Sequence, residues 1–280
     1  MGLAKLFNEV LGTEVSLPDS PSRIVSFSPA ATETLFKVGL GEKIAGVSAF
    51  CARPPDARTK RKLGSYNTVR DDVLDEVHPD LIFTVTGYQR DFGVRLSKKY
   101  SVYPLELPVS VAGIVDFVVK VGLVAGVPDR GRALAGGLLR SLSGVGRVAG
   151  LTSYVEIDLG GPVSFGRYSY ITDAFELLGS PHMYGGAPSE WLTPDLGEVS
   201  AADPDAIFYE PRMFSSFQDK ELGKLLESRK WEGLRAVRLG NLFVTPGPLD
   251  FLAHHGPSFI TEALPWLETK LRLAKERVDA

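Results

Sequence analysis

Short apolar segments alternate with amphipathic ones along most of the chain. The apolar segments that predict β-strands lie at 23–27, 44–48, 80–85, 101–105, 153–158, 206–210 and 242–245. The segments with the pattern of amphipathic helices lie between or after them, at 30–38, 89–99, 171–178, 220–228 and 257–277. Short strands separated by helices are typical of parallel βαβ units, so the sequence predicts an α/β fold.

The middle of the chain has a different pattern. Residues 112–125 and 129–148 are compatible with helix, and Gly126-Val127-Pro128 separates them. Glycines at 131, 136, 137 and 144 oppose the second helix, because each costs about 1 kcal/mol relative to alanine. We therefore expect an N-terminal lobe at 1–127 and a C-terminal lobe at 150–280. Each should be an α/β lobe with its own parallel sheet, and a single long helix within 128–149 should join them.

An internal repeat supports two related lobes. His78-Pro-Asp-Leu-Ile-Phe83 aligns with Asp203-Pro-Asp-Ala-Ile-Phe208 at an offset of 125, which also places Tyr66 on Trp191. Thr32-Glu-Thr-Leu-x-x-x-Gly39 aligns with Thr172-Asp-Ala-Phe-x-x-x-Gly179 at an offset of 140. Two matched blocks in the same order indicate a duplication.

Composition and charge narrow the class of protein. The 280 residues are 44% hydrophobic and 23% charged, as in ordinary folded proteins. A net charge of −3 gives no reason to expect nucleic acid, and the single Cys51 excludes an intrachain disulfide framework. No apolar run is long enough to span a membrane. The first 15 residues lack the apolar segment of a secretory signal. An extracytoplasmic location therefore requires that a leader was removed, and a cytoplasmic location stays open.

Two facing lobes would form a crevice at the carboxyl ends of their strands, where such folds bind ligands. The repeat predicts that Tyr66 and Trp191 project into it from opposite walls, as a clamp for a flat or bulky ligand. The alternative is that each ring packs within its own lobe. Further aromatic residues fall where strands should end: Phe50, Tyr88, Phe165, Tyr168, Tyr170, Phe214 and Phe251.

Several motifs resemble those of one known family. They are Arg23-Ile-Val-Ser-Phe-Ser-Pro-Ala-x-Thr-Glu33, Gly39, Ile44-x-Gly-Val-Ser48, Pro54-Pro55, Gly64-Ser65 and His78-Pro-Asp-Leu-Ile82. The chain resembles, over about residues 12–277, the substrate-binding proteins of ABC importers for cobalamin and iron–siderophore complexes, and is most like the vitamin B12-binding members. The resemblance implies two Rossmann-like lobes, an aromatic ring at Tyr66 that packs on the corrin, and further pocket aromatics at Phe50 and Trp191.

The resemblance also implies a partner. In this family an acidic residue on each lobe pairs with arginines of a permease dimer, and Asp72 matches the N-terminal position. The C-terminal position falls on Gly197, a departure from the pattern, with Glu198 beside it and Asp195 nearby. Asp71 and Asp72 could equally be acidic residues of a first helical turn.

The histidines and Ser28 raise three alternative interpretations: a bare metal site, an axial ligand to a bound metal chelate, and a hydrolase. A bare metal site is not expected from the four histidines, His78, His182, His254 and His255. An axial ligand to haem iron or corrin cobalt could come from His254, His255, Tyr66 or Tyr170. A hydrolase triad of Ser28, Asp250 and His254 lacks the Gly-x-Ser-x-Gly elbow, and Ser28 before Pro29 is typical of a helix cap.

We therefore expect a monomeric, non-enzymatic receptor without a resident cofactor. Its ligand would be a bulky metal chelate, with cobalamin or another corrinoid favoured and a ferric siderophore or haem as alternatives. The ligand-binding residues would be Tyr66, Trp191, Phe50, Phe165, Tyr88 and Phe251. A cytoplasmic chelate-binding protein or chaperone on the same fold, or a hydrolase, would be the remaining classes.

Overall fold

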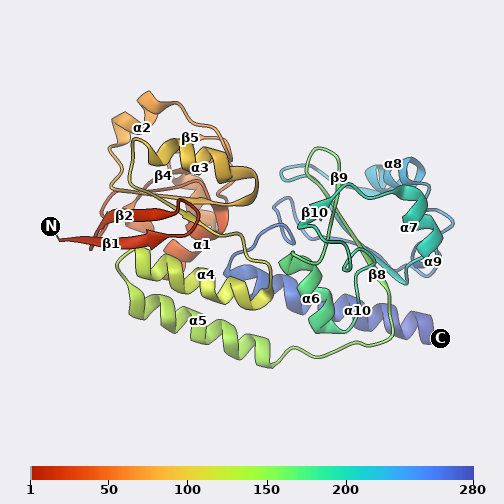
Figure 1. Ribbon diagram of the computed structural model, residues 1–280. Coiled ribbons are helices and arrows are strands. Elements are labelled where there is room, and N and C mark those ends of the chain that lie inside the picture. Colours follow the sequence, from red (N-terminus) through yellow and green to blue (C-terminus); the bar gives the residue numbers. More distant parts are fainter. Residues whose placement is uncertain (1) are drawn as a thin grey trace. The chain divides into compact units, whose positions relative to one another are not determined.

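The computed structural model describes residues 2–280, apart from the side chain of residue 219. The chain divides into two compact units (Figure 1). The first contains residues up to Pro108, Ile114–Arg140 and His255–Pro257, and the second contains Val109–Gly113, Ser141–His254 and Ser258–Ala280. None of the helices within residues 2–280 is long and apolar enough to cross a membrane.

The first unit has a five-stranded parallel sheet in the order β5-β4-β3-β6-β7. Its strands are β3 (Ile24–Ser26), β4 (Ile44–Ser48), β5 (Lys62–Gly64), β6 (Leu81–Val85) and β7 (Val102–Leu105). Its α-helices are α1 (Pro29–Lys37), α2 (Asp71–Val77), α3 (Arg90–Ser97), most of α4 (Val111–Val124) and most of α5 (Pro128–Ser143). Single 3₁₀ turns occur at Gly41–Lys43, Pro55–Thr59 and Gly87–Gln89.

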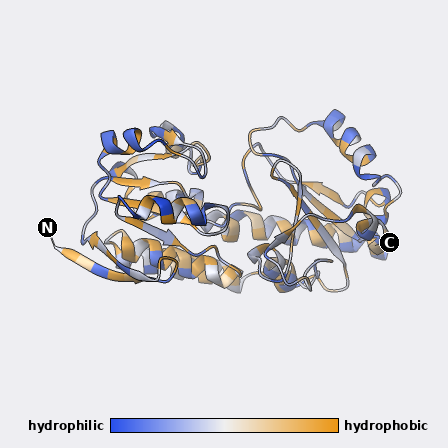
Figure 2. Cartoon of the chain, turned by 45° about the horizontal axis from the view of Figure 1, so that its top comes forward, coloured by the Kyte–Doolittle hydropathy of each residue, from blue (hydrophilic) through white to orange (hydrophobic). Residues whose placement is uncertain are grey.

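Successive side chains along the strands of this sheet pack against helices on its two opposite faces. Phe83 and Val85 belong to a buried cluster with residues of α1 and α4, whereas Ile82 belongs to a cluster with residues of α2 and α3. Successive side chains of a strand point to opposite faces, so a continuous apolar segment requires helices on both faces. Hydrophobic residues accordingly dominate the strands (Figure 2).

The second unit has a five-stranded sheet in the order β10-β9-β8-β11-β12. Its strands are β8 (Ser153–Asp158), β9 (Pro162–Phe165), β10 (Trp191–Leu192), β11 (Ala206–Glu210) and β12 (Leu242–Val244). Its helices are α6 (Tyr170–Leu178), α7 (Leu196–Ala202), α8 (Asp219–Arg229), α9 (Arg235–Arg238), a π-helical turn (Phe259–Ala263) and α10 (Leu264–Asp279). β8, β11 and β12 are parallel, as the βαβ pattern predicts.

β9 and β10 are antiparallel, which the sequence pattern did not predict. The link between β8 and β9 is only Leu159–Gly161, with Gly160 at a φ of 105°. A parallel crossover needs a dozen or more residues, so this short glycine turn permits only a hairpin. The hairpin carries Phe165 to the strand end where Trp191 pairs with it.

The internal repeat is visible in the structure. α7 and β11 begin 125 residues after α2 and β6, respectively. Both helices end in a left-handed residue, His78 with a φ of 49° and Asp203 with a φ of 42°. At the second matched block, Gly39 and Gly179 follow α1 and α6 with φ values of 75° and 78°. The repeat is therefore structural.

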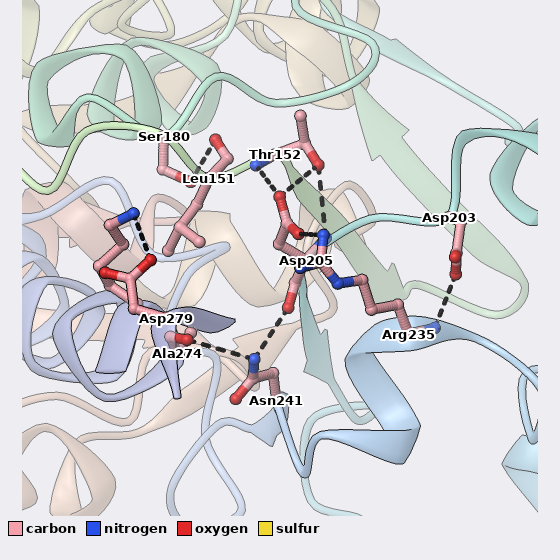
Figure 3. Close-up of polar contacts among 10 residues, drawn as sticks. Leu151, Thr152, Ser180, Asp203, Asp205, Arg235, Asn241, Ala274 and Asp279 are labelled. Atoms are coloured by element: carbon pink, nitrogen blue, oxygen red, sulfur yellow. Dashed lines mark hydrogen bonds and ion pairs between the residues drawn. The ribbon is translucent and has the colours of Figure 1, made fainter. Parts of the chain in front are cut away.

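The aspartate of each Pro-Asp motif has the same task in its own unit. Asp80 accepts hydrogen bonds from the amide and hydroxyl of Ser22, both at 2.8 Å. Asp205 accepts from the amide and hydroxyl of Thr152 at 2.9 and 3.0 Å (Figure 3). Each carboxylate thus ties the start of one strand to the segment that leads into the neighbouring strand. Asn241 extends the second network by donating to the Asp205 carbonyl at 3.0 Å.

Two features at the ends of elements differ from the predictions. Residues 3–18 form a hairpin, β1 (Leu3–Asn8) with β2 (Thr13–Pro18), where no strand was expected. Asn8 fastens it by donating to the Pro104 carbonyl at 2.9 Å. The helix predicted to reach Val148 ends at Ser143, because Gly144 follows directly and favours termination. α5 belongs to the first unit through Arg140, and its role as the inter-lobe helix stays a prediction.

Candidate functional site

In the first unit, two predicted site residues meet after neighbouring strands. Phe50 follows β4 and Tyr66 follows β5, and their rings lie edge to face with centroids 6.1 Å apart. Both side chains are half-buried, and Tyr66 also packs against the buried cluster of α1 and α4. Tyr88, in the turn after β6, is 57% exposed. The carboxyl end of this parallel sheet therefore presents three aromatic side chains in loops.

Gln89 holds the Tyr66 loop in place. Its side chain is fully buried, and its Nε2 donates to the carbonyls of Tyr66 at 2.6 Å and Phe27 at 2.9 Å. Its Oε1 accepts from the Val85 amide at 2.9 Å. One amide side chain thus joins the ends of β3 and β6 to the loop after β5. The sequence analysis missed Gln89, since nothing in the local pattern distinguishes it from a surface glutamine of a first helical turn.

In the second unit, Phe165 and Trp191 are directly opposite each other on the antiparallel β9–β10 ladder. Residues paired across a ladder project to the same face, so the structure brings these two predicted residues together. Phe165 is buried and Trp191 is half-buried. Trp191 precedes α7 as Tyr66 precedes α2, in agreement with the repeat. That Tyr66 and Trp191 face one another stays a prediction.

Phe251, the remaining predicted contact, is fixed by a buried carboxylate. Its ring is 9% exposed and lies edge-on to Trp266, with centroids 5.5 Å apart. Its amide donates to Glu210 Oε2 at 2.9 Å, and the amides of Leu252 and Ala253 donate to the same carboxylate. Burial of Glu210, with Asp250 nearby, raises the pKa of the Glu210 carboxyl to about 8.

Three further exposed apolar side chains lie on loops that follow strands of the second unit. Leu159 follows β8, Tyr168 follows β9 and Phe214 follows β11, and each is at least half exposed. Phe214 has a φ of 67°, in the left-handed region that non-glycine residues rarely adopt. The sequence marked Tyr168 and Phe214 as loop aromatics without assigning them to the site, and their exposure is a property that only the fold reveals.

The two adjacent histidines lie in the interior. His254 and His255 are each 5% exposed, and the ring of His255 is edge-on to Phe117 at 5.4 Å. The Tyr170 hydroxyl donates to the Leu252 carbonyl at 2.8 Å and is also buried. A role for these groups as axial metal ligands stays a prediction. Within the described residues, no three His, Cys, Asp or Glu side chains are grouped so that they could hold a metal ion.

The predicted docking residues are exposed at the starts of equivalent helices. Arg70 Nε donates to Asp72 Oδ1 at 3.0 Å, and a second nitrogen of Arg70 bonds Oδ2. This pair keeps the pKa of Asp72 below its usual range. Asp195 caps α7 by accepting from the amides of Gly197 and Glu198 at 2.7 and 3.0 Å, which leaves the exposed Glu198 carboxylate in its first turn.

Ser28 caps a helix, which is the role that the sequence predicted as the alternative to catalysis. It is fully buried and is the N-cap of α1, where its Oγ accepts from the Ala31 amide at 3.2 Å. Pro29 occupies the first turn, as expected for a capped helix start. The hydroxyl of Ser28 is therefore engaged in helix capping.

The family model described as periplasmic binding protein matches residues 24–249. The chain belongs to this family. A cobalamin-binding protein of Halobacterium salinarum is 24% identical over 211 residues, which are 70% of this chain and 55% of that protein. The chain therefore spans little more than half the length of this curated relative.

Solved structures of the periplasmic binding protein family share the fold. The periplasmic vitamin B12-binding protein BtuF of Vibrio cholerae has a TM-score of 0.71 at 17% identity, with 91% of this chain and 98% of that chain covered. A periplasmic haem-binding protein from Pseudomonas aeruginosa has a TM-score of 0.73 at 18% identity, with 90% and 92% covered. Identities this low establish the fold and leave the ligand open.

Proposed function

We propose that this chain is the substrate-binding receptor of an ABC importer, that it works outside the cytoplasm, and that it binds a bulky metal chelate without turning it over. The ligand is cobalamin or another corrinoid. The observation that carries the proposal is the pair of half-buried aromatics, Tyr66 and Trp191, at equivalent positions of the repeat. Each has an aromatic neighbour: Phe50 lies beside Tyr66 after the parallel strands of the first unit, and Phe165 lies beside Trp191 on the antiparallel β9–β10 ladder of the second.

The chemistry of these residues suits a large, flat, mostly uncharged ligand. Aromatic rings bury a large area in few rotamers, and edge-to-face partners such as Phe50 hold the contacting ring in one orientation. Tyr88, Tyr168 and Phe214 add exposed aromatic area in further strand-end loops. The likeness to cobalamin- and vitamin B12-binding relatives supports the same ligand class.

Binding of cyanocobalamin, haemin and a ferric siderophore, each followed by isothermal titration calorimetry, tests the proposal. We expect cyanocobalamin to bind with the highest affinity and to be recovered unchanged. Trp191→Ala should weaken it by about 30-fold or more, since truncation of an aromatic anchor costs about 2 kcal/mol or more. Leu177→Ala, which removes an exposed apolar side chain of α6, is the control and should leave the affinity unchanged. An unaffected Trp191→Ala variant would contradict the assignment.

Haem or a ferric siderophore is the second candidate, because a haem-binding structure shares the fold equally well. Tyr66 distinguishes the two. If its ring only stacks on a corrin, Tyr66→Phe should change the affinity less than threefold. If its phenolic oxygen coordinates iron, the same variant should lose most of the affinity and the charge-transfer absorption of an iron–phenolate bond.

A permease dimer is the partner that completes this function. Asp72 and Glu198, each at the start of one of the two equivalent helices α2 and α7, supply the carboxylates that pair with its arginines. Both side chains are exposed. Charge pairs of this kind direct association more than they add affinity.

A further inference from the structure

One buried carboxyl group of the second unit makes hydrogen bonds that the proposed function does not explain. Glu210 is the last residue of β11 and is 1% exposed. Three consecutive backbone amides converge on it: Phe251 and Leu252 donate to Oε2, and Ala253 donates to Oε1 at 3.1 Å. Successive amides that point at one centre form an anion-binding concavity. The carboxyl group of Glu210 occupies this one.

The segment that Glu210 holds has no regular secondary structure of its own, and other parts of the unit fasten it as well. The Tyr170 hydroxyl of α6 donates to the Leu252 carbonyl at 2.8 Å. The Phe214 amide donates to the Pro248 carbonyl at 2.6 Å. Residues 248–253 are therefore tied to the end of β11, to α6 and to the loop of Phe214. A loop with so many fixed backbone groups presents its side chains in one arrangement.

We propose that Glu210 is a positioning residue for ligand binding: its carboxylate fixes the backbone of residues 251–253 and thereby the orientation of Phe251. This rests on the proposed function and on the sequence-based prediction that Phe251 contributes to the ligand site. A carboxylate is costly to bury because it loses its hydration. Packing alone would be served by an apolar side chain, whereas three unpaired amides need an acceptor.

The carboxyl group of Glu210 titrates close to neutral pH. Burial and the neighbouring Asp250 raise its pKa to about 8, and the three amides oppose that rise. The other titratable groups around the segment are the Tyr170 hydroxyl on α6 and His254, which follows Ala253. Arg212, in the loop after β11, is paired with Asp158 at 3.4 Å. The amides hold the ionised form more firmly than the neutral form. Ligand retention should therefore improve as the pH rises through 8.

The test compares Glu210→Ala and Glu210→Gln with the wild-type chain at pH 8.5, with cyanocobalamin as the probe. Glu210→Ala should weaken binding by about tenfold or more, equivalent to about 1.4 kcal/mol. Added formate should restore a large part of the affinity by occupying the vacated concavity. Glu210→Gln keeps one acceptor oxygen and the side-chain shape, so its affinity for cyanocobalamin should lie between those of the wild-type chain and Glu210→Ala. This variant should also lose the rise in affinity between pH 7 and 9. Glu156→Gln, a buried carboxylate paired with Arg229, is the matched control and should leave binding unchanged.

Hydrogen exchange of the amides of residues 251–253 gives a readout that needs no ligand. In Glu210→Ala these amides should exchange faster, formate should slow them again, and the emission of Trp266 beside Phe251 should shift. Unchanged exchange and unchanged affinity in both variants would overturn the proposal. Faster exchange with unchanged affinity would also overturn it, because the clamp would then have no part in binding. A wild-type chain that fails to bind cyanocobalamin contradicts the corrinoid function instead, while the exchange and formate measurements still decide whether Glu210 positions the segment.

Discussion

His182 illustrates how a single titratable side chain is made part of a core. It is 3% exposed, and its Nε2 is 3.1 Å from Ser164 Oγ while its Nδ1 is 3.3 Å from the Ser153 carbonyl. The rings of Tyr154 and Tyr184 lie about it at centroid distances of 6.3 and 6.0 Å. Burial lowers the pKa of His182 to about 4. The side chain is therefore neutral in the folded unit.

We expect His182 to make the second unit sensitive to acid. The folded-state pKa of about 4 lies below the unfolded value of about 6.5, so the unfolded chain takes up a proton first as the pH falls. The stability associated with the neutral ring is present above pH 6.5 and is lost between pH 6.5 and 4, by about 3 kcal/mol in all. His182→Gln should flatten this part of the stability profile.

Urea unfolding between pH 4 and 8, followed by the fluorescence of Trp231, measures this effect, because Trp231 is edge-on to Tyr154 in the same core. His78→Asn is the matched control, since His78 is an exposed left-handed helix cap and asparagine tolerates that conformation. It should keep the wild-type slope. An equal slope in His182→Gln and the wild-type chain would show that the ring is not held neutral.

Local signals at single residues were read correctly where the chemistry is local. The cap at Ser28 follows from a serine that directly precedes a proline. Gln89 and Glu210 were missed because their partners lie far away in the sequence: Gln89 bonds Phe27, 62 residues away, and Glu210 bonds Phe251, 41 residues away. Local patterns do not report contacts of that range.

The packing of α4 on α5 depends on two glycines, and the two helices run side by side in Figure 1. A Cβ atom built on Gly122 would lie 2.7 Å from the Gly131 Cα, and one built on Gly131 would lie 3.0 Å from the Gly122 Cα. The first distance is shorter than real Cβ contacts show, and the second is so tight that the neighbouring backbone would have to shift. The glycine at 131, which opposes helix formation, is therefore what lets the two helices approach closely.

Gly131→Ala should destabilise the first unit by about 1–3 kcal/mol, the usual cost of forcing a methyl group into a tight contact. Gly136→Ala in the same helix is the matched control, because a Cβ there meets only the far end of Arg140 at 3.7 Å. It should stabilise the helix by up to about 1 kcal/mol, since alanine favours helix. Thermal unfolding of the three chains measures both effects, and stabilisation by Gly131→Ala would contradict the close packing.

The elements with strong periodicity were predicted from the sequence, and the irregular ones were not. The strands β3, β4, β6, β7, β8, β11 and β12 and the helices α1, α3, α4 and α6 lie where the alternation placed them. β10 was missed because two residues carry no pattern, and β9 because Pro162 disguises its start. The β1–β2 hairpin was missed because polar and apolar residues do not alternate regularly along its two strands. Half of its side chains, both polar and apolar, are exposed.

The chain contains a duplicated α/β unit. The duplication identifies pairs of equivalent residues in the two units that can be compared. α2 and α7 are equivalent, yet their first turns differ: Asp71 and Asp72 open α2, whereas Asp195 caps α7 and Glu198 lies in its first turn. A repeat alone would have placed the second acidic residue at Gly197. The cap formed by Asp195 shows how the unit keeps an acidic helix start with different residues.

Docking to a permease can be tested by reversing these charges one at a time. Asp72→Lys should slow association with the permease dimer in nanodiscs and weaken binding by about tenfold or more at low salt, because in the proposed function this carboxylate pairs with a permease arginine. Asp129→Lys, at an exposed acidic residue of α5, changes the net charge equally and is the matched control. The difference between the two variants should shrink at high salt, since exposed charges more than about 8 Å apart are screened at physiological ionic strength.

The bond between Arg70 and Asp72 sharpens this expectation. A docking arginine has to replace Arg70 at the same carboxylate, so Arg70→Gln should leave Asp72 more available and strengthen permease binding modestly. An exposed ion pair contributes only about 0–1 kcal/mol, which limits the gain to about fivefold. Affinity for cyanocobalamin should be the same in all of these variants. If Asp72→Lys instead lowers the affinity for cyanocobalamin and leaves permease association intact, Asp72 belongs to the ligand site and the docking assignment is wrong.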